Sequence, residues 1–126
     1  MSSYRIVLIG EDDEAKIRWV NSLIGIPGRY SLISTGVEIS EVKMIDGTEF
    51  TFCNVIGDYK YKQNLYKEHC KVSNAALMFV SWNGSMDEQY VEWYLEVCPN
   101  NQVIYIQDPS KGRSKTIKEL YNSVVK

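Results

Sequence analysis

The most constraining feature of the sequence is a pair of β-rich runs that flank the dipeptide Asp46-Gly47. An Asp-Gly pair between two such runs is a strong signal for a tight turn that joins antiparallel strands. Apolar and polar residues alternate at the start of the first run, and the alternation resumes in the second run. We therefore expect an antiparallel hairpin over residues 37–52. The phase of the apolar residues changes before Val42, which predicts a β-bulge in the first strand.

The rest of the chain alternates strand patterns with helix patterns. Short apolar runs predict buried strands at residues 4–9, 75–81 and 103–106. Helical patterns occur at residues 15–24, 61–71, 87–98 and 116–125. This alternation predicts an α/β domain of three layers with a mostly parallel sheet, to which the hairpin adds one antiparallel edge. No internal repeat or linker divides the chain, so we expect a single domain over residues 1–126.

Composition excludes several classes of protein. Hydrophobic residues make up 44% and charged residues 24% of the chain, as in ordinary globular domains, and the net charge of −2 argues against nucleic acid or an anionic membrane as a partner. Three cysteines without a C-x-x-C pair and a single histidine predict free thiols and no metal site. Neither end carries a secretory signal or a lipidation box, and no apolar run approaches ~18 residues. We therefore expect an intracellular protein, cytoplasmic or nuclear, without a membrane anchor.

The loop after the first predicted strand partly matches a phosphate-binding loop. That motif reads G-x-x-x-x-G-K-[ST] between a strand and a helix, and Gly10 and Lys16 match its first glycine and its lysine. Ala15 replaces the second glycine, and Ile17 replaces the hydroxyl residue that binds Mg²⁺. The acidic residues 11–14 would face the phosphates, and like charges ~4 Å apart repel by about 1 kcal/mol even in bulk water. These carboxylates either stabilise the start of the following helix through its dipole or collect a cation.

Two segments resemble a known family. Residues 34–40 (STGVEIS) and 45–57 (IDGTEFTFCNVIG) follow the order and spacing of motifs in Ras-superfamily small GTPases, closest to the Ran and Rab branches. The resemblance covers roughly residues 4–107. It implies a truncated small-GTPase fold of the P-loop NTPase type, because one helix pattern follows Ser110 where the family has a further strand and a longer tail.

The same resemblance implies that the active-site groups are altered together. Asn54 stands where the family has the aspartate that holds Mg²⁺, Asp58 where it has the water-orienting glutamine, and Ser110 where it has the guanine-binding aspartate. We therefore expect a pseudo-GTPase with no catalytic residue, no cofactor and no metal. Ser34 and Thr35 are alternative matches to the switch-one threonine. The vestigial nucleotide-binding positions are Gly10, Lys16, Ser34, Thr35, Asn54 and Gly57.

In the family, the matching segments 34–41 and 58–66 contact effector proteins. Tyrosine is enriched at protein interfaces, which fits the second segment. We expect a protein-interaction module, or a decoy that competes with genuine small GTPases for their partners. The free edge of the hairpin strand offers a homodimer as a further option. The candidate partner-binding residues are Val37, Glu38, Ile39, Tyr59, Tyr61 and Tyr66.

Two alternatives remain open at the level of sequence. One is an atypical guanine-nucleotide-binding GTPase with a relocated Mg²⁺ site, formed by Asp12, Asp13 or Asp58. The other is a degenerate response-regulator receiver, which resembles this chain in its acidic cluster after the first strand. Asn54 would then replace the phosphoacceptor aspartate, and phosphate would have to enter at Asp58. The hairpin favours the Ras-like fold, because receivers have a helix between their second and third strands.

Overall fold

A computed structural model describes residues 3–22, 30–34, 36–57, 59–81, 86–108 and 112–125. The strands are β1 (Ser3–Ile9), β2 (Tyr30–Ser34), β3 (Val37–Lys43), β4 (Glu49–Val55), β5 (Ala75–Phe79) and β6 (Gln102–Ile106). The helices are α1 (Asp13–Asn21), α2 (Tyr59–Lys71), α3 (Asp87–Val97) and α4 (Arg113–Leu120), followed by the π-helical stretch η2 (Tyr121–Val125). None of these described helices is both long and apolar enough to cross a membrane.

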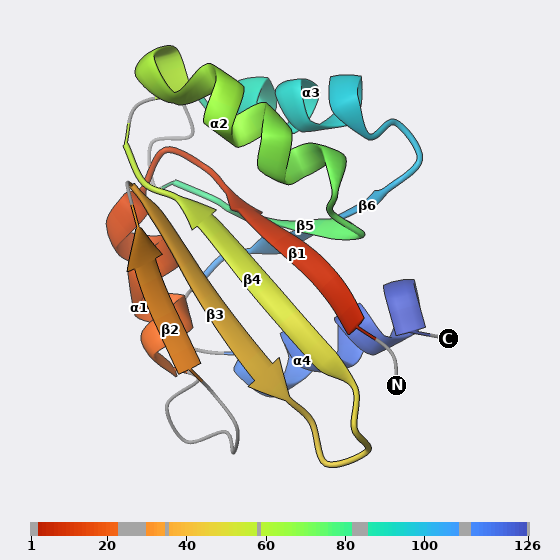
Figure 1. The fold of residues 1–126 in the computed structure, drawn as a ribbon. Coiled ribbons are helices and arrows are strands. Elements are labelled where there is room, and N and C mark those ends of the chain that lie inside the picture. The colour runs from red at the N-terminus through yellow and green to blue at the C-terminus, as the bar shows by residue number, and fades with distance from the viewer. Residues whose placement is uncertain are drawn as a thin grey trace.

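The described residues form one six-stranded sheet in the order β2-β3-β4-β1-β5-β6, with helices on both faces (Figure 1). β1 is parallel to both β4 and β5, and β5 is parallel to β6. β2, β3 and β4 pair antiparallel to one another. The predicted α/β class with a mixed sheet between helical layers is confirmed. Because β1, β4, β5 and β6 run in the same direction, the loops that follow them meet at one edge of the sheet.

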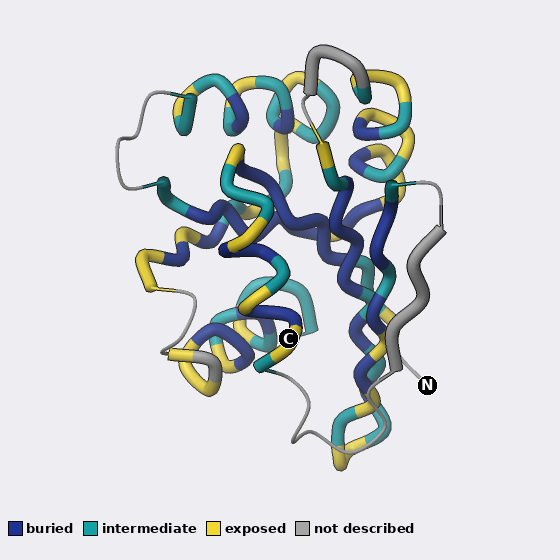
Figure 2. Tube along the Cα trace, turned by 90° about the vertical axis from the view of Figure 1, so that its left-hand side faces the viewer, coloured by how far each residue is buried: buried dark blue, intermediate teal, exposed yellow. Residues whose placement is uncertain are grey.

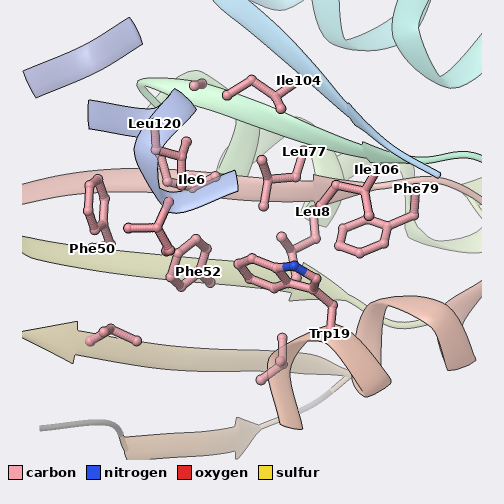
Figure 3. Packing of buried hydrophobic residues seen from close by; sticks show 14 of the residues in the cluster. Ile6, Leu8, Trp19, Phe50, Phe52, Leu77, Phe79, Ile104, Ile106 and Leu120 are labelled. Carbon is pink, nitrogen blue, oxygen red and sulfur yellow. The ribbon is translucent and has the colours of Figure 1, made fainter. Parts of the chain in front are cut away.

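The core has two parts, one on each face of the sheet. Side chains from α1 and α4 pack on one face, where Trp19 meets Phe52 edge-on with ring centroids 5.0 Å apart (Figure 3). Side chains from α2 and α3 pack on the other face. Every residue of β5 is buried, as its continuous apolar run predicts for a strand covered on both faces. Figure 2 shows the buried residues concentrated along the strands between the two helical layers.

The predicted hairpin is formed by β3 and β4. Its turn is closed by two backbone hydrogen bonds, from Met44 N–H to the Thr48 carbonyl oxygen (2.7 Å) and from Gly47 N–H to the Met44 carbonyl oxygen (2.9 Å). Gly47 has a φ of 91°, a conformation that glycine adopts without strain. The Asp46-Gly47 signal therefore located both the turn and the antiparallel pair.

The predicted β-bulge is wrong, because β3 pairs with β4 in unbroken register along its whole length. Val37 and Ile39 belong to the α2/α3 side of the core, whereas Val42 belongs to the α1/α4 side. The phase of the apolar residues changes because each face of β3 is covered by apolar groups along part of the strand. Glu38 and Ser40, on the same face as Val42, are buried as well.

β2 was not expected from the sequence. It pairs antiparallel with β3 from Tyr30 opposite Glu41 to Ser34 opposite Val37. β3 therefore has a neighbouring strand on each side, and the prediction that the hairpin has a free edge is wrong. Within the described part of the chain, β2 is the outer strand at this end of the sheet.

Candidate functional site: the loops after β1 and β4

The loops that follow β1 and β4 lie side by side, because these two strands are parallel neighbours. The helices that follow them, α1 and α2, pack on opposite faces of the sheet (Figure 1). In α/β sheets, ligands bind in the crevice that opens where neighbouring connections part in this way. A cavity of about 390 Å³ lies here, lined by Glu11, Asp13, Gly57, Met86 and Tyr90.

One carboxylate bridges the two loops. Asp13 Oδ1 lies 2.9 Å from the ammonium nitrogen of Lys16, and Asp13 Oδ2 accepts a hydrogen bond of 2.9 Å from Gly57 N–H. Lys16 also donates to the carbonyl oxygen of Val55 at 3.5 Å. The lysine of the phosphate-loop pattern and the glycine after β4 are thus held by the same side chain of this chain.

Lys16 is buried, with 2% of its surface exposed. Burial lowers the pKa of Lys16, and the carboxylates of Asp13 and Asp12 act against this shift. A buried ammonium is costly unless it is paired, so Asp13 is the group that makes this position tolerable. Lys16 is therefore a buried, acid-paired lysine.

Three carboxylates of the acidic run lie at the start of α1. Asp12 caps α1, because its Oδ1 accepts a hydrogen bond of 3.0 Å from Ala15 N–H. Asp13 and Glu14 lie in the first turn of α1, where negative charge is favourable. The helix-stabilising interpretation therefore fits Asp12, Asp13 and Glu14, whereas Glu11 precedes the helix and accepts a hydrogen bond of 3.4 Å from the Ser81 hydroxyl. Within the described ranges, no group of three or more His, Cys, Asp or Glu side chains is arranged to hold a metal ion.

Two glycines of the site have no room for a larger side chain without movement of a neighbour. Gly10 has a φ of 130°, and a Cβ atom there would lie only 2.8 Å from the carbonyl oxygen of Phe79 on β5. Gly36 and Gly57 also have positive φ, and the side chain of Lys62 passes over both. A Cβ atom on Gly36 would lie 2.8 Å from Lys62 Nζ. Lys62 therefore brings a second cation to this edge of the sheet.

Asn54 lies on β4 next to the site but does not line its cavity. Its exposed fraction is 0%, and neither atom of its amide has a hydrogen-bond partner among the described residues. It stands opposite Leu8 on β1 and Glu38 on β3. Asn54, which the sequence resemblance places at a Mg²⁺ position, is thus sealed inside the protein.

The remaining predicted nucleotide-binding positions are less closely placed. Ser34 is the last residue of β2, where it pairs with Val37, and only its main chain is described. Thr35, Asp58 and Ser110 lie outside the described residues. The structure therefore brings together Gly10, Lys16 and Gly57 at one edge.

The expected partner-binding surface needs a correction. Val37 and Glu38 are 6% exposed and Tyr66 is 4% exposed, so none of them offers a contact surface. They are buried because β3 is an inner strand and because Tyr66 packs edge-on against Tyr90 beneath α2. Ile39 is half-buried against the same side of the core. The side chains of two further candidates lie outside the described part, those of Tyr59 and Tyr61.

The contacts of two charged side chains at this site escaped the sequence reasoning. Asp13 was grouped with its acidic neighbours, although its spacing of three residues from Lys16 on a helix is a known signal for an ion pair. Lys62 gave no signal, because its approach to Gly36 and Gly57 depends on the tertiary fold. No protein-family model matches the sequence, and a search of curated proteins finds no match either.

Proposed function

We propose that this chain is a catalytically inactive small-GTPase-like protein, a pseudo-GTPase that acts as a protein-interaction module or decoy without binding or hydrolysing GTP. The observation that carries the proposal is the bridge from Asp13 to Lys16 and Gly57. In a phosphate-binding loop the lysine reaches the β- and γ-phosphates. Here its charge is already neutralised by a carboxylate of the same loop.

The arrangement of the strands supports a Ras-like fold for the proposal. β4, the second strand of the hairpin, lies beside β1, and β1 is followed directly by Gly10 and by α1, which carries Lys16. A receiver would need a helix where the turn between Met44 and Thr48 connects the two strands. The hairpin thus weighs against the receiver alternative for the same reason as in the sequence.

Bound phosphate would have to displace a partner that is tethered to the loop itself. An intramolecular carboxylate competes at a high effective concentration, which short tethers place in the millimolar range or above. The phosphate would also meet Glu11 and Asp13, which line the cavity. The Mg²⁺ that normally offsets such repulsion would lack its usual ligands, since Ile17 has no oxygen in its side chain and Asn54 is sealed in the core.

An interaction role is the remaining part of the proposal, and its surface must differ from the one first expected. With Val37, Glu38 and Tyr66 buried, the main chain of β2 is the described feature nearest to the family's effector strand. Outer strands present unpaired main-chain groups that another chain can use. A decoy would use this end of the sheet.

The proposal is tested by thermal unfolding of the chain with and without millimolar GTP or GDP and Mg²⁺. Ligand at ~100 times its dissociation constant would add about 2.7 kcal/mol, which raises the melting temperature by several degrees for a domain of this size. We expect no rise, and no guanine nucleotide released when the purified protein is denatured. A rise that requires Mg²⁺ and disappears in the Lys16→Met variant would contradict the proposal, because it would show that the lysine is available to phosphate.

A further inference from the structure

The sheet ends in an open strand on the side away from β2. Within the described part of the chain, β6 pairs only with β5. The carbonyl oxygen of Ile106 accepts a hydrogen bond of 3.0 Å from Val80 N–H, so the main chain of Ile106 faces β5. Main-chain groups of successive residues in a strand point to opposite sides. Val103 and Tyr105 therefore direct their N–H and carbonyl groups away from the sheet.

Tyr105 stands between two grooves on this open edge. Its exposed fraction is 57%, among the highest for a large apolar side chain in the described residues. On the side of α3, a groove of about 340 Å³ is lined by Tyr105, Val91 and three acidic residues, Asp87, Glu88 and Glu92. On the side of α4, a second groove of about 190 Å³ includes Tyr105 and Ile106.

We propose that the edge of β6 binds an extended segment of a protein partner that carries lysine or arginine at alternate positions. An added strand would take its main-chain hydrogen bonds from Val103 and Tyr105. Side chains in a strand alternate between the faces of the sheet, so every second residue of the segment enters the groove beside α3. The carboxylates of Asp87, Glu88 and Glu92 make that groove complementary to a basic side chain.

The charge of this groove also decides against a second copy of the chain. Two copies paired through β6 in one continuous sheet would bring their α3 carboxylates next to each other, which is unfavourable. The surface lies at the other end of the sheet from β2, and the described residues that line its groove differ from those that line the cavity after β1 and β4. The proposal therefore stands or falls independently of nucleotide binding.

The first test is an NMR titration of the ¹⁵N-labelled full chain with a capped peptide of about six residues that alternates lysine and valine, a length that spans one strand. The control peptide has glutamate in place of lysine. We expect chemical-shift changes in β6 and α3, slower hydrogen exchange at the Val103 and Tyr105 amides, and about tenfold weaker binding of the glutamate peptide. Equal affinity for the two peptides, absence of changes in β6 up to millimolar peptide, or self-association through β6 would overturn the proposal.

Two variants of one position separate main-chain pairing from side-chain effects. Tyr105→Pro removes the outward N–H but leaves the hydrogen bonds to β5 in place, and proline is tolerated at sheet edges. Tyr105→Thr removes the same ring and keeps the N–H. We expect binding of the lysine peptide to be lost in the proline variant and retained within about threefold in the threonine variant. Equal binding by both variants would overturn the proposal.

Reversing the charge of the groove beside α3 tests the proposal even if the Tyr105→Pro variant does not fold. Glu88→Lys combined with Glu92→Lys changes exposed side chains of α3 and leaves the β6 main chain untouched. We expect the double variant to prefer the glutamate peptide over the lysine peptide. An unchanged preference for lysine would show that these carboxylates do not select the segment, and the proposal would be wrong.

Discussion

Replacing Asp13 by asparagine should destabilise the protein through Lys16. Asparagine keeps an oxygen that can accept the hydrogen bond from Gly57 N–H, so the change removes mainly the negative charge. Loss of one partner of a buried ion pair costs about 3–5 kcal/mol. The side chain of Lys16 is 3% exposed but that of Asp13 is 31% exposed, so water partly screens the pair. We therefore expect a loss of about 2–3 kcal/mol in the free energy of unfolding.

A double-mutant cycle with Lys16→Met isolates this interaction. Lys16→Met should cost less than Asp13→Asn, because Asp13 would keep its contact with Gly57 and with solvent. In the presence of Lys16→Met, the further change of Asp13 should have little effect. Urea unfolding of the four proteins, followed by tryptophan fluorescence, should give a coupling energy of about 1.5–3 kcal/mol. A coupling below about 0.5 kcal/mol would refute the reasoning that Asp13 neutralises the loop lysine.

We also expect Asp13→Asn and Lys16→Met to change how the free energy of unfolding depends on pH. Burial lowers the pKa of Lys16 in the folded state below its ordinary value of 10.5. Between these two pKa values the unfolded chain binds more protons, so the contribution of Lys16 to stability rises with pH. Asp13→Asn removes a group that raises this pKa, and the rise should therefore begin at a lower pH. Other groups titrate in the same range, and some lower stability as the pH rises; one is Cys70, where burial raises the pKa to about 12. The Lys16→Met variant keeps these groups, so the difference between its pH profile and that of the unmodified protein isolates Lys16.

Three further predictions concern a buried amide, two glycines and two cysteines. Asn54→Leu, a change of similar shape, should raise the free energy of unfolding by about 1–2 kcal/mol, because it removes a buried amide that has no partner among the described residues. A loss of stability in urea unfolding would show that the amide is satisfied. Gly10→Ala should lower the free energy of unfolding by at least about 1 kcal/mol more than Gly47→Ala. Both glycines have positive φ, but only at Gly10 would the added Cβ lie 2.8 Å from a backbone oxygen. Equal losses of stability in the two variants would contradict this. When the native protein is treated with iodoacetamide, mass spectrometry should find Cys98 modified well before Cys70. Cys98 is partly exposed, whereas Cys70 is fully buried and its pKa is raised. Equal rates of modification would show that Cys70 is not buried.

The parts of the fold that sequence predicted are those fixed by local physics. The Asp46-Gly47 turn needs a positive φ that glycine supplies, and the flanking runs can pair only as the turn directs. The run Ala75–Phe79 is apolar at every position, which indicates a strand with cover on both faces. From these signals the α/β class and the hairpin follow without knowledge of distant contacts.

The parts that sequence missed depend on contacts between distant residues. β2 is short, and its pairing with β3 leaves no signature in its own five residues. Glu38 is an acidic residue in a buried position, which no pattern of alternation predicts. Asp13 and Gly57 are separated by 44 positions, and their hydrogen bond exists only because β1 and β4 are neighbours. The structure therefore places Lys16 and Gly57 close together, but their shared contact with Asp13 could not be read from the sequence.

The contacts within the loop after β1 have a common physical consequence. A loop built for phosphate keeps its lysine and backbone N–H groups ready for an anion, and that arrangement is costly while no ligand is bound. Here Asp12 caps α1, Ala15 N–H donates to that cap, and Asp13 binds Lys16 and the Gly57 amide. Lys16 and the N–H groups of Ala15 and Gly57 each have a partner within the chain. The loop can therefore be stable without ligand, as expected if this edge of the sheet now serves as structure and binding to other proteins takes place elsewhere on the surface.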